Sequence, residues 1–499
     1  MRKYKNALRA LVFCLLAAAL LVGLRQVFRF KLGGDPEGTS GTTQMEVYYQ
    51  QPENSVDVLV LGTSHAYRSV SPGLLYEQQG IAAYDLCASS QAIWNTYYYL
   101  REGLKTQKPS LIVLEAAGIA LIQNDYDLDT SQAEIVASLY GMKFSKNKLA
   151  AIRASVAQGE DWLPLLLDWT QYHARYTDLT AADFLPWQGN ETYFSSWKGF
   201  EADWRVTDCG TLTVTPSDEA KPLYEKTERY YRAILDLAQS EGIPVCVIVT
   251  PYPGYNTAAE RGYYNTIAGI AAQYGVNYID FNTEQWYAEM GLDGASDFSD
   301  TGHLNYAGAV KFTTAFGAYL RDTYDLPDRS GDAAYASWLE SAAYDANRDR
   351  DKTLAAETDL TAYLEALADG GDDYTVLLYA AGCDTLTDYT DALEALGIPA
   401  DSVAAAAAGS GAWAVRGGQL LFDSAGQTGY TWHWQDGYQD LAIVQGDDGT
   451  VRLFAGADNY ANIGKNGLNI LVWDNATGQL ADAVGFYALY GYEAERLSR

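Results

Sequence analysis

Basic side chains are scarce in this chain of 499 residues, which holds 34 lysines and arginines against 64 aspartates and glutamates. Seven of the basic residues fall within residues 1–31, where there is no acidic residue. The other 468 residues hold 27 basic and 64 acidic side chains, a formal net charge of -37. Such a body repels a phosphate backbone and, apart from its basic N-terminus, an anionic lipid surface. The composition therefore excludes general nucleic-acid binding.

Cysteine and histidine are also rare, with five and four copies. The sequence has no CxxC pair and no cluster of cysteines and histidines, which are the patterns that hold structural zinc. Cys87 and Cys246 lie in apolar, strand-like runs, where a buried free thiol is the ordinary state. The sequence predicts neither a metal site nor a cofactor.

One long hydrophobic run lies near the N-terminus, at residues 10–24 between Arg9 and Arg25. It is shorter than the roughly 20 residues that cross a bilayer. Apolar residues just beyond Arg25, with snorkelling of the flanking basic side chains, extend it to a span. A cleaved signal peptide is the alternative, but the small residues 17–19 lie inside the run rather than after it. We expect a single-pass anchor in the cell membrane, with everything after about residue 32 exported.

Changes in composition divide the chain into five segments. Apolar residues make up 48% of the chain and charged residues 20%, which excludes wholesale disorder and allows a large core. We expect a signal-anchor, a tether, a catalytic domain, a helical linker and a β-rich accessory domain. Their predicted bounds are residues 1–31, 32–55, 56–325, 326–373 and 374–499.

Short apolar runs alternate with helical patterns in the predicted catalytic domain. Strands that alternate with helices form a parallel sheet covered on both faces. One helix is predicted over residues 91–106. A longer one is predicted from Pro216 to Gly242, because Pro-Ser-Asp-Glu supplies a cap and an acidic first turn. The predicted strands are residues 56–61, 82–87, 111–114, 245–249 and 277–281.

A long insertion, residues 116–215, separates the third predicted strand from the next helix. The segment is rich in aromatic residues and irregular, and it is too long for a plain connection. Insertions at the carboxyl edge of a parallel sheet usually build or cover a site. We therefore expect this segment to contribute to the functional site.

Two short motifs carry the chemistry. Ser64 stands in Gly-Thr-Ser-His immediately after the first predicted strand, where its hydroxyl can face a cleft. Asp300 and His303 stand in Asp-Thr-Gly-His, just before an amphipathic helix. Their spacing on a turn lets the carboxylate reach the imidazole Nδ1 while Nε2 points elsewhere, which orients a base for a serine nucleophile.

These motifs resemble the SGNH/GDSL hydrolase superfamily over residues 56–325, with Gly-Thr-Ser as its first block and residues 300–312 around His303 as its last. The chain is most similar to the membrane-anchored, exported branch that includes proteins of cell-wall D-alanylation and alginate O-acetylation. The resemblance implies a three-layer α/β/α sandwich with the site at the strand carboxyl ends. It also implies Ser64 as nucleophile, His303 as general base and Asp300 as its orienting partner.

The sequence departs from the family at both remaining blocks. The second block supplies an oxyanion-hole glycine, but Ala-Ser-Ser-Gln (88–91) stands there, so Ser89 and Ser90 or a nearby backbone N–H become the candidates. The third block supplies an asparagine, but Glu-Ala-Ala-Gly (115–118) replaces it, and Asn124-Asp125 lies nine residues beyond the strand. Loss of one oxyanion donor costs about 10²–10³ in rate. We expect weak stand-alone esterase activity.

The other histidines have two interpretations each. His65 either faces a ligand beside the nucleophile or is a polar group at the start of a helix. His173 and Arg175, in the insertion, either bind substrate or belong to a packed aromatic loop, and we favour the loop. His433, between two tryptophans, is expected on a sheet surface or in its packing.

The C-terminal tail resembles the interleukin-like EMT-inducer module, a compact β-rich, lectin-like unit. The similarity rests on residues 463–478 and 483–486, which form a strand, an Asn-Ala-Thr-Gly turn and a returning strand. Any hairpin can show this pattern.

The sequence thus predicts an extracytoplasmic serine acyl esterase or O-acyltransferase that acts on a cell-surface glycan or its acyl ester. A membrane protein that donates acyl groups is a possible partner. The alternative is a catalytically weak binding or assembly factor for envelope polymer synthesis, which uses the same cleft.

Overall fold

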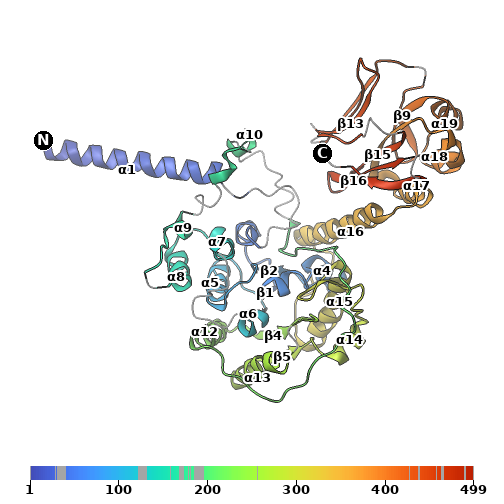
Figure 1. Ribbon diagram of the computed structural model, residues 1–499. Coiled ribbons are helices and arrows are strands. Elements are labelled where there is room, and N and C mark those ends of the chain that lie inside the picture. The colour runs from blue at the N-terminus through green and yellow to red at the C-terminus, as the bar shows by residue number, and fades with distance from the viewer. Residues whose placement is uncertain are drawn as a thin grey trace. The chain divides into compact units, whose positions relative to one another are not determined.

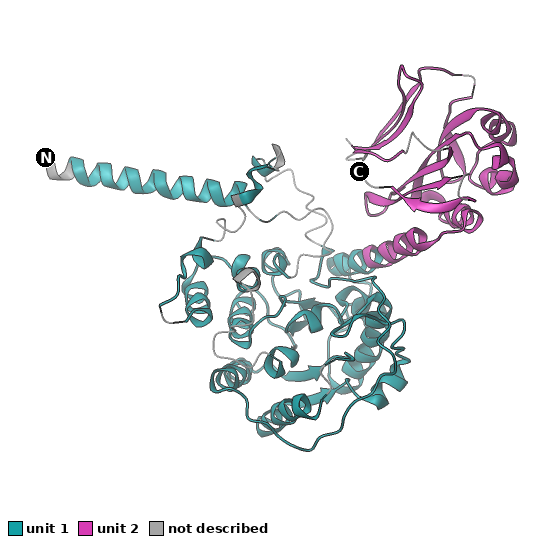
Figure 2. Cartoon of the chain, in the orientation of Figure 1, with its two compact units in different colours: residues 1–343 teal, residues 344–499 magenta. Residues whose placement is uncertain are grey.

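The chain folds into two compact units, residues 1–343 and 344–499 (Figure 2). Each unit has a sheet and a hydrophobic core of its own. The computed structural model describes residues 2–28, 30, 41–121, 132–157, 159–167, 173–177, 179, 181–184, 196–254, 257–425, 427–436, 439–456, 458–461, 466–487 and 491–497.

A five-stranded parallel sheet forms the centre of the first unit, with strand order β2-β1-β3-β4-β5. The predicted α/β fold class and its five strands are confirmed. The reason is that β1 to β4 are short runs whose residues are all buried, which only a sheet covered on both faces provides, whereas the edge strand β5 is partly exposed. The strands are β1 (Val58–Leu61), β2 (Ala83–Asp85), β3 (Leu111–Glu115), β4 (Val245–Val249) and β5 (Asn277–Asp280).

Helices cover the two faces of this sheet and create two separate cores, because alternate strand side chains point to opposite faces. Leu59 and Leu61 pack with α5, α12 and α13, whereas Val58 and Val60 pack with α4 and α15. Figure 1 shows α5 and α12 on one side of the sheet and α4 and α15 on the other. The helices around the sheet are α3 (Ser64–Tyr67), α4 (Pro72–Gln79), α5 (Ile93–Gly103), α12 (Glu225–Glu241), α13 (Ala258–Gln273), α14 (Glu284–Met290) and α15 (Tyr306–Thr323).

The predicted start of the long helix at Pro216 is wrong, because α12 begins at Glu225. Pro222 explains the difference: a proline disfavours the helical conformation of the residue before it. The segment before it lies instead along α13, where Lys221 N donates to Gly262 O at 2.8 Å and Asn265 Nδ2 donates to Ser217 O at 2.7 Å.

The predicted tether is also wrong for residues 41–55, which are part of the packed domain. Helix α2 (Gln44–Tyr48) is buried, and the Gln44 side chain explains its position. Gln44 Oε1 accepts a hydrogen bond from Cys87 N at 2.6 Å, and Gln44 Nε2 donates to Gly199 O at 2.7 Å. Residues 32–40 of the predicted tether lie outside the described residues.

The insertion after β3 is more helical than the irregular segment that we predicted. Its helix α8 packs on α5, where Asn147 Nδ2 donates to Tyr98 O at 2.9 Å and to Glu102 Oε2 at 2.8 Å. Its elements are α6 (Ala117–Ala120), α7 (Gln132–Tyr140), α8 (Lys146–Ser155), α9 (Leu163–Leu166), α10 (Ala181–Phe184) and the 3-10 helix η2 (His173–Thr177).

The N-terminal helix α1 (Arg2–Val27) is long and apolar enough to cross a membrane, with a mean hydropathy of 2.5 over its best window. Its side chains are not buried against the rest of the protein. Where it ends, Phe30 N donates a hydrogen bond to Tyr140 Oη at 2.8 Å. The helix therefore fits the predicted anchor and meets the insertion at its C-terminal end.

The second unit is built on antiparallel sheets, as the prediction of a β-rich C-terminal domain requires. Its six-stranded sheet has the order β10-β9-β8-β15-β16-β17, and a four-stranded sheet has the order β11-β12-β13-β14. Strands β15 and β16 form a hairpin around the Asn-Ala-Thr-Gly turn. The strands are β8 (Tyr374–Ala381), β9 (Ser410–Arg416), β10 (Gln419–Asp423), β11 (Thr431–Asp436), β12 (Gln439–Gln445), β13 (Val451–Ala455), β14 (Asp458–Asn459), β15 (Gly467–Asp474), β16 (Gln479–Tyr487) and β17 (Glu493–Arg496).

Helices complete the second unit. They supply Leu360, Leu364 and Val403 to the core beneath the six-stranded sheet. The helices are α17 (Leu360–Asp369), α18 (Thr390–Ala395) and α19 (Ala400–Ala407), together with the end of α16 (Ala336–Ala356), which begins in the first unit.

Candidate active site

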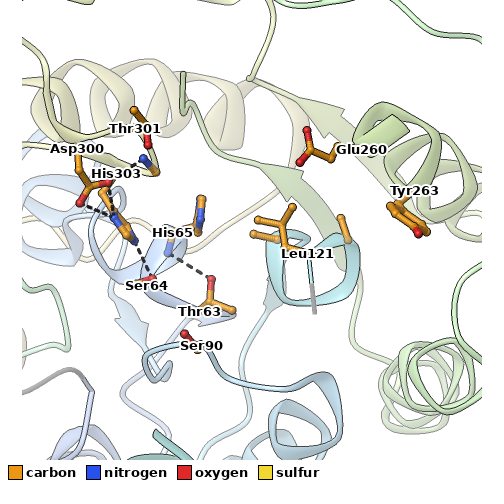
Figure 3. Close-up of a pocket in the computed structure, with 13 residues that line it drawn as sticks. Thr63, Ser64, His65, Ser90, Leu121, Glu260, Tyr263, Asp300, Thr301 and His303 are labelled. Atoms are coloured by element: carbon orange, nitrogen blue, oxygen red, sulfur yellow. Dashed lines mark hydrogen bonds and ion pairs between the residues drawn. The ribbon is translucent and has the colours of Figure 1, made fainter. Parts of the chain in front are cut away.

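Ser64 is the first residue of the short helix α3, at the carboxyl end of β1. Thr63 caps this helix, since its Oγ1 accepts a hydrogen bond from His65 N at 3.3 Å. A polar cap directly after a buried apolar strand turns the chain sharply, which brings the serine to the edge of the sheet. The hydroxyl of Ser64 thus faces the cavity described below (Figure 3).

A small hairpin presents the acid and the base. It consists of β6 (Phe298–Asp300) and β7 (His303–Leu304), and Gly302 N donates a hydrogen bond to Asp300 Oδ1 at 2.7 Å. The hairpin leads directly into α15, which Asn305 caps by accepting from Gly308 N at 3.1 Å. The buried helix therefore fixes the position of the turn.

The structure brings Ser64, His303 and Asp300 into one hydrogen-bonded chain. His303 Nε2 lies 2.8 Å from Ser64 Oγ, and His303 Nδ1 lies 2.9 and 3.1 Å from the two oxygens of Asp300 (Figure 3). The hydrogen bond from His303 lowers the pKa of Asp300 to about 2, so the carboxylate is ionised at neutral pH. An ionised carboxylate only accepts hydrogen bonds, which places the proton on Nδ1 and leaves Nε2 free to accept the serine proton.

A cavity of about 560 Å³ opens beside Ser64. Small apolar side chains form one wall, and Glu260 and Tyr263, both from α13, lie at the far end from the triad (Figure 3). The described lining residues include no lysine or arginine. They are Thr63, Ser64, His65, Ser90, Ala117, Ala120, Leu121, Glu260, Tyr263, Asp300, Thr301, Gly302 and His303.

His65 lies in the wall of this cavity, as the ligand-facing interpretation requires. Its ring packs edge-on against Tyr252 at 4.9 Å between centroids and lies 5.1 Å from the ring of His303. Burial lowers the pKa of His65 to about 3, so the imidazole is neutral. Its Nδ1 is buried, and none of the described residues forms a hydrogen bond with it.

The two serines that we predicted for the oxyanion side have different positions. Ser90 lines the cavity and has a left-handed backbone, with φ of 46°. Ser89 is not among the lining residues, and its side chain hydrogen-bonds to the Tyr67 hydroxyl. Among the described residues, none accepts a hydrogen bond from the Ser64 backbone N–H, which leaves that donor available beside the nucleophile.

The carboxyl group of Glu115 binds the turn that holds Ser64 and the start of the segment after β3, contacts that we did not predict. Its Oε1 accepts a hydrogen bond from Ala117 N at 2.7 Å, and its Oε2 accepts one from Thr63 Oγ1 at 3.4 Å. Burial raises the pKa of Glu115 to about 8, so this carboxyl is protonated at neutral pH. The signal in the sequence is an acidic residue that closes the apolar run Leu111–Leu114 and must therefore find polar partners.

Gly118 packs closely against both the turn that holds Ser64 and the loop after β2. A Cβ added at Gly118 would lie 2.9 Å from Thr63 Cγ2 and 3.0 Å from Gln91 O. Only glycine therefore allows the segment after β3 to contact both the nucleophile turn and the loop after β2.

The position of Glu260 and Tyr263 in the cavity lining was not predicted either, because α13 carries no sequence feature that marks a site.

The remaining candidates lie elsewhere. Arg175 pairs with Asp183 Oδ1 at 2.6 Å within the insertion and does not line the cavity. The side chain of His173 and the pair Asn124-Asp125 lie outside the described residues. His433 lies on β11 in the second unit, where it pairs with Asp440. Cys87 and Cys246 are buried free thiols, as predicted.

Within the described ranges, no group of three or more histidine, cysteine, aspartate or glutamate side chains could hold a metal ion.

Comparisons with known proteins add little to this description. No protein-family model matches the sequence, and neither does any curated protein sequence. Among solved structures, a provisionally named acylhydrolase from Bacteroides fragilis has a TM-score of 0.27 at 10% identity, over 58% of this chain and 99% of its own. A gut microbial diltiazem-metabolizing enzyme has a TM-score of 0.20 at 10% identity, over 54% of this chain and 48% of its own. At these scores, neither likeness bears on the chemistry.

Proposed function

We propose that this protein is a membrane-anchored, extracytoplasmic serine acyl esterase or O-acyltransferase of the SGNH type, which acts on cell-surface polysaccharide. One observation carries the proposal: Ser64 Oγ, His303 and Asp300 form a continuous hydrogen-bonded chain at the edge of a cavity. This arrangement activates a serine for attack on an ester carbonyl.

The reaction follows from the positions of the protons. Ser64 Oγ attacks the carbonyl carbon while His303 Nε2 accepts the serine proton, and Asp300 stabilises the imidazolium. The ester bond then breaks, the leaving alcohol takes the proton from His303, and the acyl group stays on Ser64. Water or a sugar hydroxyl, deprotonated by the same histidine, attacks the acyl-enzyme and restores the serine.

The cavity and the anchor support an uncharged glycan as the partner of this reaction. Within the described part of the chain, no lysine or arginine lines the cavity, so its lining offers no guanidinium or ammonium group to a phosphate or carboxylate of an anionic polymer. Helix α1 would hold residues 56–325 close to the membrane and to a membrane protein that delivers acyl groups. Such tethering raises the effective concentration of the two partners.

A specific observation favours a second candidate, a catalytically weak binding or assembly factor for envelope polymer synthesis. Among the residues that the structure describes, the lining of the cavity contains no asparagine, glutamine, lysine or arginine that could act as an oxyanion donor. Backbone N–H groups would have to supply that stabilisation.

A fluorophosphonate probe separates the two candidates, because only an activated serine reacts with it. We expect the full-length protein to become labelled and the Ser64→Ala variant to stay unlabelled. Aryl acetates should then be consumed slowly, and a panel of neutral oligosaccharides should speed their consumption and gain the acetyl group. An unlabelled wild-type protein would support the assembly factor, and brisk hydrolysis with no acylated sugar would support an esterase.

A further inference from the structure

Large hydrophobic side chains are exposed in few places outside helix α1. Six of the nine such residues among the described parts of the chain fall within residues 144–184 of the insertion, and none falls in the second unit. Scattered exposed apolar residues need no explanation, but a group of them marks an interaction surface. The six residues are Phe144, Leu149, Trp162, Leu163, Tyr176 and Phe184.

Helix α8 shows how this surface is organised. Asn147, Ala151 and Ile152 are buried on one side of the helix. Lys146, Leu149 and Arg153 follow one another at spacings of three and four residues, which places them together on the opposite, exposed side. An exposed apolar side chain with exposed cations beside it can enter a membrane interface while the cations contact the lipid headgroups.

We define a docking face by six exposed residues, which are Phe144, Lys146, Leu149, Arg153, Trp162 and Leu163. Trp162 and Leu163 belong to it because α9, which begins at Leu163, packs against α8. Phe144 precedes α8 and has 74% of its surface exposed.

Local charge distinguishes the docking face from the rest of this acidic protein. Residues 141–155 contain four basic side chains and no acidic one, although Glu160 and Asp161 follow. Within the described residues, neither Lys146 nor Arg153 forms an ion pair. Both cations therefore remain available for the phosphate groups of lipids.

The docking face lies next to the end of the proposed anchor. Arg25, which follows the apolar run of α1, donates from Nη2 to Tyr140 O at 3.5 Å, and Phe30 N donates to the Tyr140 hydroxyl. Tyr140 ends α7, and the four residues from it to Phe144 limit their separation to about 14 Å. An arginine at the end of a membrane span lies at the headgroup level. The contact with Arg25 therefore holds the insertion at that level too.

We propose that the docking face binds the outer leaflet of the same membrane that α1 spans. The inference rests on the proposed anchoring by α1 and adds a second attachment to it. A single span leaves the body free to rotate, whereas a span and a docked face together hold the first unit in one orientation. Trp162 and Phe144 would enter the interface while Lys146 and Arg153 contact the headgroups.

The test uses the full-length protein reconstituted into vesicles of phosphatidylcholine and phosphatidylglycerol. An environment-sensitive fluorophore is attached through Leu163→Cys or through Leu339→Cys, in a background that carries Cys14→Ser and Cys209→Ser. Leu163 and Leu339 are a matched pair, since each has 47% of its surface exposed and only Leu163 belongs to the docking face. A third sample carries the fluorophore on the native Cys14, which is exposed in the middle of α1.

We expect lipids that carry a nitroxide to quench the fluorophores at positions 14 and 163 several-fold more than the one at position 339. The double variant Lys146→Glu/Arg153→Glu should reduce quenching at position 163 while thermal unfolding stays unchanged. Quenching at position 14 but not at position 163 would overturn the docking face alone, as expected if a protein covers it instead. Absence of quenching at both positions would overturn the anchor as well.

Discussion

The cavity beside Ser64 has two unlike walls. On one wall, the serine, histidine and aspartate side chains contact one another at 2.8–2.9 Å, and the aspartate is ionised. On the other wall, the described lining side chains are those of Ser90, Ala117, Ala120 and Leu121, and none of these four is an amide or a cation. The described residues of the cavity thus include a candidate proton relay of side chains, whereas the candidate oxyanion donors among them are backbone N–H groups.

This difference has a chemical consequence. A serine with a complete proton relay forms an acyl-enzyme, but weak oxyanion stabilisation slows every attack on a carbonyl, including the attack of water that releases the acyl group. A sugar hydroxyl bound in the cavity would compensate by its position, which can lower a barrier by several kcal/mol. The contrast between the walls therefore favours transfer over hydrolysis.

The largest effect is expected from the relay wall. Ser64→Ala removes the nucleophile, so fluorophosphonate labelling should disappear and ester turnover should fall by at least about 10³-fold. Labelling followed by gel fluorescence and a chromogenic acetate assay measure the two effects. If the variant keeps wild-type turnover, the hydrolysed ester is bound at a different site and the relay has no catalytic role.

Asp300→Asn should have the second largest effect. An asparagine can no longer hold the proton on His303 Nδ1, so turnover should fall roughly 10²–10⁴-fold while the serine remains in place. The pH dependence of labelling gives an independent readout. A variant whose labelling depends on pH in the same way as that of the wild type would show that Asp300 does not orient the base.

A smaller effect is expected from the opposite wall. Ser90→Ala removes its hydroxyl but keeps the backbone N–H, so turnover should fall less than about 10-fold. A fall of about 10²–10³-fold, as found for a true oxyanion donor, would show that the Ser90 hydroxyl stabilises the oxyanion. The two walls would then both act through side chains. Ser90→Gly serves as the control, because glycine removes the same hydroxyl and adopts the left-handed backbone without strain.

The smallest effect on turnover is expected at Glu115, where the informative measurement is stability. Its folded-state pKa is raised to about 8 by burial, so the folded protein binds one more proton than the unfolded protein between about pH 4.5 and pH 8. Stability from this group is therefore lost as pH rises through that window. Glu115→Gln should show a smaller fall in the thermal midpoint between about pH 5 and pH 8 than wild type. An equal fall in both proteins would mean that Glu115 is ionised in the fold.

Much of this architecture was predictable from the sequence because it is encoded locally. Short apolar runs that end in Gly62 or in polar residues specified the strands, and the spacing of Asp300 and His303 specified a turn that orients the imidazole. The position of Ser64 directly after a strand specified the edge of the sheet on which the site lies.

Features that depend on distant contacts were missed. Gln44 gives its segment a fixed place only through hydrogen bonds to Cys87 and Gly199, which are far away in the sequence. Helix α12 starts late because the segment before it binds to α13. Glu260 reaches the cavity because of how α13 packs, although locally it is an ordinary member of a capping box. Local patterns cannot report such partners.

The central claim is that Ser64 forms an acyl-enzyme that water releases slowly and a sugar hydroxyl releases faster. The most direct test is mass spectrometry of the intact full-length protein during incubation with 4-nitrophenyl acetate, with and without neutral oligosaccharides. We expect one acetyl group to accumulate on Ser64, and an oligosaccharide acceptor to remove it and become acetylated. Absence of any adduct on the wild-type protein throughout turnover, with no acetylated sugar, would contradict the claim.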